Sequence, residues 1–466
     1  MTRRDFLQAS AGFAISTILP GTDDYDIVIH GGRVIDPETK LDAIRHVGIR
    51  GGRIAAISAK ELKGKRTIEA KGLVVAPGFI DPISHGQDLE NDRLQLLDGV
   101  TTKLQMESGA LDVPQWYQDQ KGKRMIHYGC GASHSQSRRK VLNERDIPAT
   151  DAQIATICAM VDKGLKEGGL GVGFGLEYQA ATTRWEVLEA FRVAGRYKAS
   201  CHVHTRYGAL LEEQSNLTAI SEVLSASLIS GAPIHIVHVP SMALSITKRA
   251  LQVIEEAQRK GFDVTCDFYP YTAFGTGISS EVFDPGWQEK FGIDYKDLEW
   301  AKTHERLTKE TFEKYRADGG TVLAHAIPES AVQAAVKSPA AMVGSDGSLK
   351  DGVGHPRSAG TFCRVVGHYC RELHLIPLPT ALAKTSLMAA KRFEHRCPDF
   401  KRKGRVQVGA DADLVIFDPV TVNDKATFDN PAQPSVGMKW VLLHGQEAVR
   451  EGKLVEDSRL GKPLRA

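Results

Sequence analysis

Two hydrophobic patterns divide the chain into a centre and two flanks. In the centre, short runs of aliphatic and β-branched residues alternate with longer stretches in which apolar residues recur every three to four positions. The short runs predict strands at 102–106, 171–175, 199–203, 234–237, 263–266, 321–324 and 341–343, and the long ones predict helices at 151–167, 185–197, 217–228 and 242–260. Repeated strand-then-helix units predict an α/β fold with a parallel sheet, whose usual closed form at this size is a (β/α)8 TIM-like barrel.

Both ends of the chain show short apolar runs separated by turns instead. Such runs cover 26–36 and 47–57, each containing a Gly-Gly pair, and return at 412–417 and 440–446. Neither end is long enough to bury a core alone. We therefore expect both ends to pair into one small β-sandwich domain beside the barrel.

The length of 466 residues agrees with one large and one smaller domain. The expected boundaries are 23–75 and 405–466 for the discontinuous β-sandwich and 76–404 for the catalytic barrel. The net charge of +2 gives no electrostatic reason to expect nucleic acid or a membrane surface as partner. The seven cysteines include no C-x-x-C pair, which argues against a zinc ribbon or a disulfide framework.

The first residues have the pattern of an export signal. Arg3 and Arg4 precede Phe6 and Leu7, and a weakly apolar segment follows. This pattern predicts a twin-arginine signal over 1–22 and a periplasmic protein, whereas an ordinary terminus would leave the protein in the cytoplasm. No other segment is long and apolar enough to span a bilayer, so we expect a small-molecule substrate and no stable membrane insertion.

Residues suited to chemistry stand at the ends of the predicted strands. The stretch 74–85 reads as a strand, a Pro-Gly break and a first barrel strand, and it ends in polar residues. The candidates along the chain are Asp81, His85, Glu107, His204, His238 and Asp346. Each alone is commonly structural, but barrel enzymes collect their catalytic residues at these strand ends, so the series predicts a shared metal site.

The residue types favour zinc. Two neutral imidazoles and a carboxylate form a three-ligand Zn²⁺ site that leaves a position for water. Bound Zn²⁺ lowers the pKa of that water and polarises a carbonyl group. A nearby aspartate could then take the proton of the water and pass it to a leaving nitrogen.

The motifs that carry these residues resemble the amidohydrolase superfamily, and within it the D-aminoacylase (N-acyl-D-amino-acid deacylase) branch. The resemblance covers about 25–460 and is carried by the segments 99–102, 171–178, 204–206, 263–272, 344–347, 355–362 and 409–415 together with His238. It implies that His204 and His238 hold the tightly bound metal ion. Glu107 or Ser108 falls where the branch often has a bridging cysteine, and we favour Glu107 because a serine is a poor zinc ligand.

The same resemblance assigns roles around the metal. Asp346 matches the catalytic aspartate that acts as general base and then as acid. Arg357 and Tyr269 match positions that hold the substrate carboxylate, a task for which a guanidinium is well suited. Tyr178 would polarise the scissile carbonyl, and His134 matches a further motif that we assign to substrate binding.

Two positions depart from the branch. The usual Asp-x-His-x-His opening has Ile83 in place of its first histidine. A second metal site would lack that ligand, so we expect one tightly bound Zn²⁺, with His85 as a weak ligand or a neighbour of the ligands. Pro240 stands where relatives that prefer acidic side chains can have a lysine, which argues against a dedicated N-acyl-D-glutamate substrate.

These features predict a zinc-dependent hydrolase of linear amides that releases D-amino acids from N-acylated forms. A hydrolase of cyclic amides or other C–N bonds is one alternative. A binding protein that has lost catalysis together with the histidine at position 83 is the other.

Overall fold

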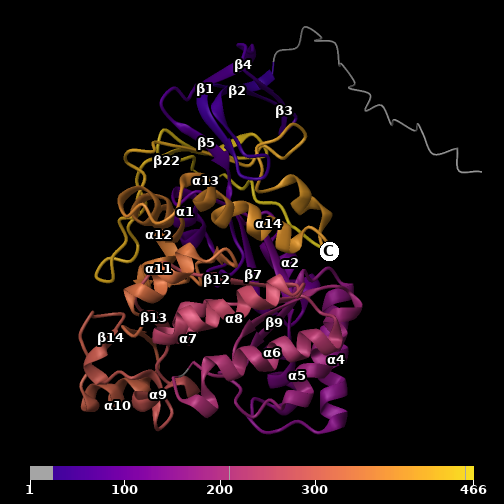
Figure 1. The fold of residues 1–466 in the computed structure, drawn as a ribbon, viewed down its shortest axis with the longest axis vertical. Coiled ribbons are helices and arrows are strands. Elements are labelled where there is room, and N and C mark those ends of the chain that lie inside the picture. Colours follow the sequence, from indigo (N-terminus) through magenta and orange to yellow (C-terminus); the bar gives the residue numbers. More distant parts are fainter. Residues whose placement is uncertain (1–24, 209, 457) are drawn as a thin grey trace, which may run out of the picture.

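Eight parallel strands form the barrel at the centre of the molecule (Figure 1). The computed structural model describes residues 25–208, 210–456 and 458–466. Within this part the barrel strands, in chain order, are β6 (Phe79–Asp81), β7 (Val100–Ala110), β8 (His127–Ser133), β9 (Gly171–Gly175), β10 (Ser200–His204), β11 (Ile234–Ile236), β12 (Val264–Phe268) and β16 (Ala341–Val343). They are almost fully buried, as parallel strands covered by helices should be.

Side-chain and loop contacts join the first and last barrel strands. The backbone N–H of Ser345, after β16, donates to Oδ1 of Asp81 at the end of β6 at 2.9 Å. The backbone N–H of His85 donates to the carbonyl oxygen of Gly347 at 3.0 Å. These bonds bring the segment after the first strand against the segment after the last one, where catalytic residues were expected.

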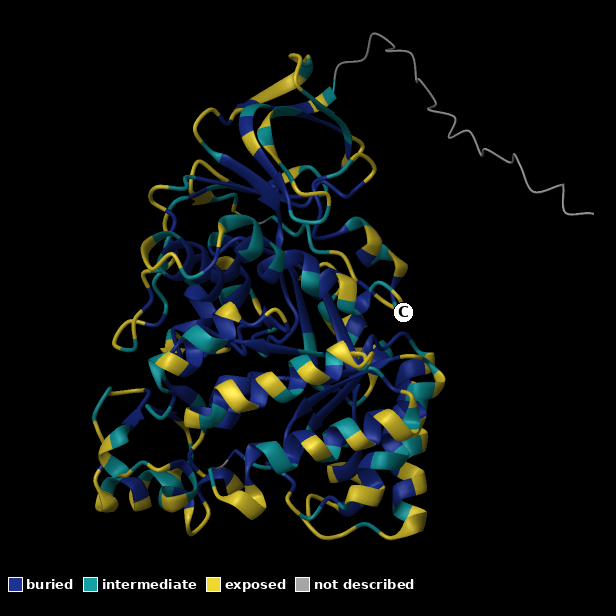
Figure 2. Cartoon of the chain, in the orientation of Figure 1, coloured by how far each residue is buried: buried dark blue, intermediate teal, exposed yellow. Residues whose placement is uncertain are grey.

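Helices surround the barrel, and the sides that face it are buried while the outer sides are exposed (Figure 2). They are α1 (Leu89–Leu97), α2 (Val113–Gln120), α3 (His134–Leu142), α4 (Asp151–Lys166), α5 (Arg184–Arg196), α6 (Asn216–Ser230), α7 (Val239–Ala243), α8 (Thr247–Arg259), α11 (Glu329–Lys337), α12 (Arg357–Arg364), α13 (Leu378–Leu382) and α14 (Met388–Phe393). Side-chain caps define several N-termini. Thr150, for example, accepts from the backbone of Gln153, whose side chain bonds back to Thr150 and completes a capping box.

Both ends of the described chain contribute to a second sheet, at the top of Figure 1. Its strands are β1 (Tyr25–Asp36), β2 (Leu41–Arg50), β3 (Arg53–Ser58), β4 (Gly64–Glu69), β5 (Val74–Pro77), β19 (Leu414–Phe417), β20 (Met438–Leu443), β21 (Gln446–Arg450) and β22 (Lys453–Leu454). The pairing of β5 with β19, Val75 opposite Ile416, joins the N-terminal and C-terminal parts. This arrangement agrees with the expected fold class.

The chain passes from this sheet into the barrel at Gly78. A Cβ atom at Gly78 would lie 2.3 Å from Oγ1 of Thr101, so only glycine allows β5 and β6 to follow one another this closely. The Pro-Gly break in the sequence therefore marks the junction.

One strand that was predicted for the barrel belongs to a different sheet. Residues 321–324 were expected among the barrel strands, but β15 (Thr321–Ala324) pairs antiparallel with β13 (Phe274–Gly277) and β14 (Leu298–Trp300) in a separate sheet. With α9 (Trp287–Phe291) and α10 (Lys309–Asp318), these strands form an insertion of residues 274–324 between β12 and α11. Periodicity identifies a strand but not its partner, so the sequence could not separate the two sheets.

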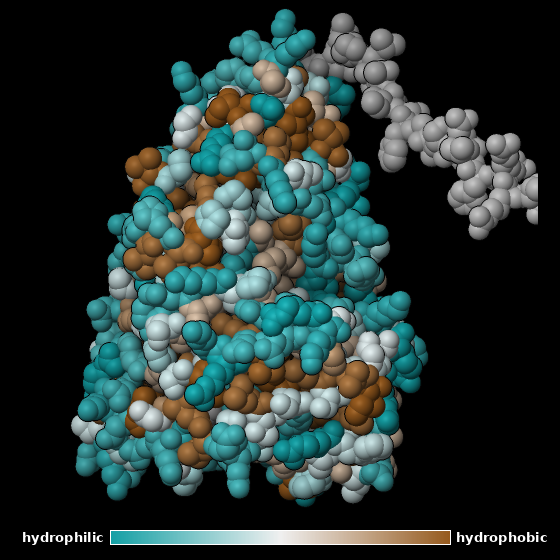
Figure 3. Space-filling model, in the orientation of Figure 1, coloured by the Kyte–Doolittle hydropathy of each residue, from teal (hydrophilic) through white to brown (hydrophobic). Residues whose placement is uncertain are grey.

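Hydrophobic side chains on the face seen in Figure 3 form separate patches among hydrophilic ones. Among the described residues, no helix combines the length and the apolar character needed to cross a membrane. The proposed signal segment 1–22 lies outside the described residues.

Candidate active site

A cavity of about 390 Å³ opens at the carboxyl ends of the barrel strands. Its walls include seven of the predicted site residues: His85, Glu107, Tyr178, His204, His238, Asp346 and Arg357. A small cavity of about 30 Å³ adjoins it and is lined by Tyr269 and by Met242, Phe274, Val282 and Phe291. The position agrees with the rule that barrel active sites lie at this end of the strands.

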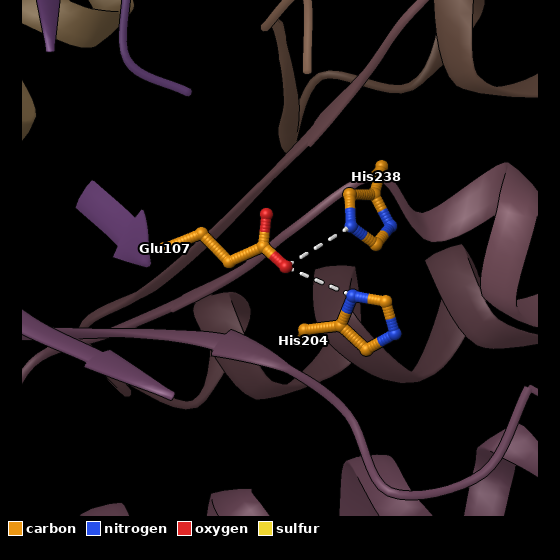
Figure 4. Close-up of side chains that lie close together, drawn as sticks. All are labelled: Glu107, His204 and His238. Atoms are coloured by element: carbon orange, nitrogen blue, oxygen red, sulfur yellow. Dashed lines mark hydrogen bonds and ion pairs between the residues drawn. The ribbon is translucent and has the colours of Figure 1, made fainter. Parts of the chain in front are cut away.

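Glu107, His204 and His238 bring three possible metal ligands together (Figure 4). Oε1 of Glu107 lies 2.9 Å from Nδ1 of His204 and 3.8 Å from Nε2 of His238. Glu107 comes from β7, His204 ends β10, and His238 follows β11 in a left-handed backbone conformation with φ of 33°. All three side chains are buried.

The charges around these atoms suit a cation. Of the three buried carboxylates at the described site, Asp346 is paired with Arg357 and Glu177 with Lys290, whereas the ion-pair partners of Glu107 are all histidines. Burial raises the pKa of Glu107, but the neighbouring imidazoles hold it well below its usual value. Glu107 is therefore ionised and has no arginine or lysine as an ion-pair partner among the described residues, and this donor set fits a divalent metal ion such as Zn²⁺.

Glu107 also contacts a second group. His85 Nε2 lies 3.1 Å from Oε2 of Glu107 and 2.9 Å from Oδ1 of Asp346. Burial lowers the pKa of His85, but its hydrogen bonds to the two carboxylates outweigh this and raise the pKa to about 10. Ser108 Oγ lies on the other side of the ring, 3.4 Å from Nδ1 of His85, so Glu107 rather than Ser108 places an oxygen between His204 and His238.

The Ile83 side chain has no atom that could bind a metal ion. It is fully buried in the barrel interior, in the cluster that contains Leu104, Met106 and Val237. A second metal ion held by His85, Glu107 and Asp346 would therefore have no ligand from position 83.

Asp346 is positioned by Arg357. Oδ2 of Asp346 lies 2.9 Å from Nη1 of Arg357, and the Arg357 guanidinium stacks over the ring of Tyr269 at 4.6 Å. Burial would raise the pKa of Asp346, but the charge of Arg357 outweighs it and the pKa stays below its usual value. Asp346 is thus an ionised carboxylate that can accept a proton.

Two phenols face the cavities. The Tyr178 hydroxyl lies 3.2 Å from Oγ1 of Thr276, and the Tyr269 side chain is buried beside Arg357. Burial raises the pKa of both phenols, so both remain protonated and can donate hydrogen bonds.

His134 lies outside the cavity. It is fully buried, stacks on Phe174, and its Nε2 lies 3.1 Å from Glu186, which also pairs with Arg138. The structure does not bring His134 to the site, because this face of α3 contacts Phe174 of β9 and Glu186 of α5. Ser135, Gln136 and Arg139 on the adjoining face of α3 line the cavity instead.

The sequence analysis missed a chain of contacts behind His204. Nε2 of His204 lies 3.0 Å from Oε2 of Glu177, and Nζ of Lys290 lies 2.6 Å from Oε1 of Glu177. Ser241 similarly contacts Nδ1 of His238 at 2.8 Å. Glu177 lies within a recognised motif, but nothing in the sequence links it to Lys290, which follows 113 positions later.

A (β/α)8 barrel whose cavity at the carboxyl-terminal side of the strands contains two histidines, a shared carboxylate and an aspartate defines a class of metal-dependent hydrolases. The family model described as "Amidohydrolase family" matches residues 294–449. D-aminoacylase from Alcaligenes xylosoxydans xylosoxydans is 28% identical, with 92% of this chain and 95% of that protein covered. The N-acyl-D-glutamate deacylase of the same organism is 29% identical, with 90% and 93% covered.

Solved structures of the same kinds of enzyme are also similar to this chain. N-acyl-D-glutamate deacylase from Bordetella bronchiseptica, in complex with zinc and a phosphonate inhibitor, superposes with a TM-score of 0.83 at 28% identity, covering 95% of this chain and all of that one. A D-aminoacylase crystal structure gives 0.82 at 26% identity with the same coverage. In sequence and in fold, the chain is similar to the D-aminoacylase branch of the amidohydrolase superfamily over nearly its whole length.

Proposed function

We propose that this protein is a metal-dependent hydrolase of linear amides that releases D-amino acids from N-acyl-D-amino acids. One observation carries the proposal: Glu107, His204 and His238 converge beside the Asp346–Arg357 pair in a single cavity. The arrangement supports assigning the first three as metal ligands, Asp346 as the proton acceptor and Arg357 as the carboxylate-binding cation. The similarity to D-aminoacylase supports the choice of substrate.

Glu107, His204 and His238 would hold the metal, and Zn²⁺ is the ion that fits two imidazoles and a carboxylate. When bound, zinc supplies polarisation of the amide carbonyl and a more acidic water. The absence of a ligand from Ile83 favours one tightly held ion, with His85 as a contact of Glu107 and Asp346.

The protein side chains handle protons and orientation. Oδ1 of Asp346 accepts the proton of the attacking water and returns it to the leaving nitrogen. Arg357 binds the substrate carboxylate, helped by Tyr269 on its other side, and so fixes the amide in the cavity. The Tyr178 phenol donates a hydrogen bond to the carbonyl oxygen as negative charge develops there.

A panel of N-acyl-D- and N-acyl-L-amino acids, assayed with the metal content of the same sample, tests the proposal. We expect hydrolysis of the D series with about one zinc ion per chain. Hydrolysis of the L series alone would refute the stereochemical assignment. Turnover of hydantoins or lactams in its place would favour the cyclic-amide alternative, and a metal-free protein without turnover would favour a binding protein.

We also propose export to the periplasm by the twin-arginine route. The support is the Arg3-Arg4 pair before Phe6 and Leu7. Replacing both arginines by lysine should leave the protein in the cytoplasmic fraction of a bacterial host, whereas the wild-type chain should appear in the periplasmic fraction. Equal distribution of the two forms would contradict export by this route.

A further inference from the structure

The lining of the 390 Å³ cavity includes an arginine side chain, Arg139, that has no role in the proposed chemistry. Arg139 lies on α3, together with Ser135 and Gln136 on the same face, because residues three and four apart on a helix are neighbours. The Arg139 side chain is exposed at the cavity and forms no hydrogen bond or ion pair with any residue that the structure describes.

The other polar groups of this wall are already engaged. Gln136 donates its amide hydrogens to the carbonyl oxygens of Ser108 and Gly109, at 3.3 and 3.2 Å. The hydroxyl of Ser135 accepts from the backbone N–H of Gly175 at 2.8 Å. These bonds fix the wall, and the Arg139 guanidinium is the charged group of this wall that makes no such bond with the described residues.

The other charged side chains of the cavity differ from Arg139 in that they pair with one another. Arg357 is balanced by Asp346, while Glu107 and His85 contact each other. The small adjoining cavity is lined by Met242, Phe274, Val282 and Phe291, by the Glu177 carboxylate and by Arg357, the residue assigned to the first carboxylate. With Arg357 assigned to the first carboxylate, a second negatively charged group meets an unpaired cation of the described cavity lining at the α3 wall.

We propose that Arg139 is a specificity-determining residue that binds a second carboxylate of the substrate, distal to the scissile amide. This inference rests on the proposed hydrolysis of N-acyl-D-amino acids, in which Arg357 holds the first carboxylate. A guanidinium suits the task because it can form two parallel hydrogen bonds with a carboxylate. The second carboxylate belongs either to an acidic amino-acid side chain or to a dicarboxylic acyl group.

Two matched substrate pairs distinguish these sources. N-acetyl-D-glutamate is compared with N-acetyl-D-glutamine, and N-succinyl-D-leucine with its terminal amide, so that each pair differs in one charge. We expect the acid of one pair to be hydrolysed with a kcat/KM roughly tenfold to a hundredfold above that of its amide, the range of a charge-assisted contact. The preferred pair identifies the source of the carboxylate.

Arg139→Gln should abolish that preference while leaving kcat/KM for the amide partner unchanged, which also shows that the variant is folded. Lys140→Gln removes the same charge from the next residue, an exposed lysine outside the cavity lining, and should keep the preference. Equal rates within both wild-type pairs, or a preference that survives Arg139→Gln, would overturn the inference while turnover of the amides still upheld the proposed function. If neither pair were hydrolysed, the proposed function itself would fail.

Discussion

The backbone N–H of Asp346 donates a hydrogen bond of 2.8 Å to the carbonyl oxygen of Ile83. The segment that departs from the Asp-x-His-x-His pattern at position 83 thus still positions the proposed catalytic aspartate, through its main chain. The Ile83 side chain meanwhile packs in the buried cluster of the barrel interior that contains Leu104 and Met106. The residue that replaces a histidine has a structural role, and the variants below separate structural from chemical roles.

Ile83→Ala should lower the free energy of unfolding by about 2–5 kcal/mol, because it leaves a cavity in a close-packed core. It should not lower the zinc content, since Ile83 offers no ligand atom. Denaturant unfolding and metal analysis measure the two effects. Ile44→Ala, at a side chain that is 60% exposed, serves as control and should change stability little. Loss of zinc with unchanged stability would contradict this assignment.

Glu107→Gln should remove most of the bound zinc, because a neutral amide oxygen is a weaker ligand than a carboxylate. Ser108→Ala, one position away, should retain zinc and activity, since its hydroxyl contacts His85 and lies outside the three-donor group. Metal content after dialysis is the measurement. The opposite pattern would make Ser108 the relevant ligand.

Asp346→Asn should reduce kcat roughly 10²- to 10⁴-fold while zinc remains bound, because the amide cannot accept the proton. Asp351→Asn is a matched control: it also has a left-handed backbone conformation but lies in an exposed loop. Steady-state kinetics with metal analysis test the pair. Near-normal turnover of zinc-loaded Asp346→Asn would disprove the proposed proton transfer.

Lys290→Met should weaken zinc binding about tenfold to a hundredfold, the usual effect of losing an outer-shell contact. Lys290 holds Glu177, and Glu177 fixes the ring of His204 through Nε2. The variant Lys290→Arg keeps the positive charge and should retain the zinc affinity of the wild type. Lys296→Met, at an exposed lysine, should leave zinc affinity unchanged. Competition with a zinc-binding dye gives the affinities. Unchanged affinity in Lys290→Met would show that Glu177 acts without the lysine.

The stability of the protein should depend on pH through His127, which lies at the junction of the barrel and the second sheet. Its Nε2 lies 3.2 Å from Asp413, while Nδ1 accepts from the backbone N–H of Lys462 at 3.0 Å. Burial, reinforced by the charge of Lys403 and opposed by Asp413, lowers the pKa of His127 from 6.5 to about 4. A proton on Nδ1 would break the bond to Lys462.

Because the unfolded chain binds this proton more readily, stability should be fully present above pH 6.5 and decrease as pH falls towards 4, by roughly 3 kcal/mol in total. Unfolding free energies measured across this range should show a smaller slope for His127→Gln. The exposed His395→Gln should keep the wild-type slope. An identical slope in wild type and His127→Gln would rule out this residue as the source.

Some elements escaped sequence analysis for identifiable reasons. Strand β8 has glycines at 129 and 131, which dilute its hydrophobic pattern. A Cβ at Gly131 would lie 2.9 Å from the carbonyl oxygen of Gly171, so close strand packing requires the residue that obscures the strand. On α3, one helical position of about 100° separates His134, which pairs with Glu186, from the cavity-lining Ser135.

The sequence by itself determined the barrel, the pairing of both chain ends and the positions of His204, His238 and Asp346 at or just after strand ends. It also singled out Glu107, although that residue lies inside β7, which continues to Ala110. Hydrophobic periodicity is local, and the strand ends of a parallel barrel meet at one face whatever their separation in the chain. The tertiary structure alone decided that Ile83 turns into the core and that Lys290 supports Glu177. It also decided that Arg139, rather than His134, faces the cavity. These relationships depend on which side chains pack against each other, and packing between distant segments leaves no periodic trace in the sequence.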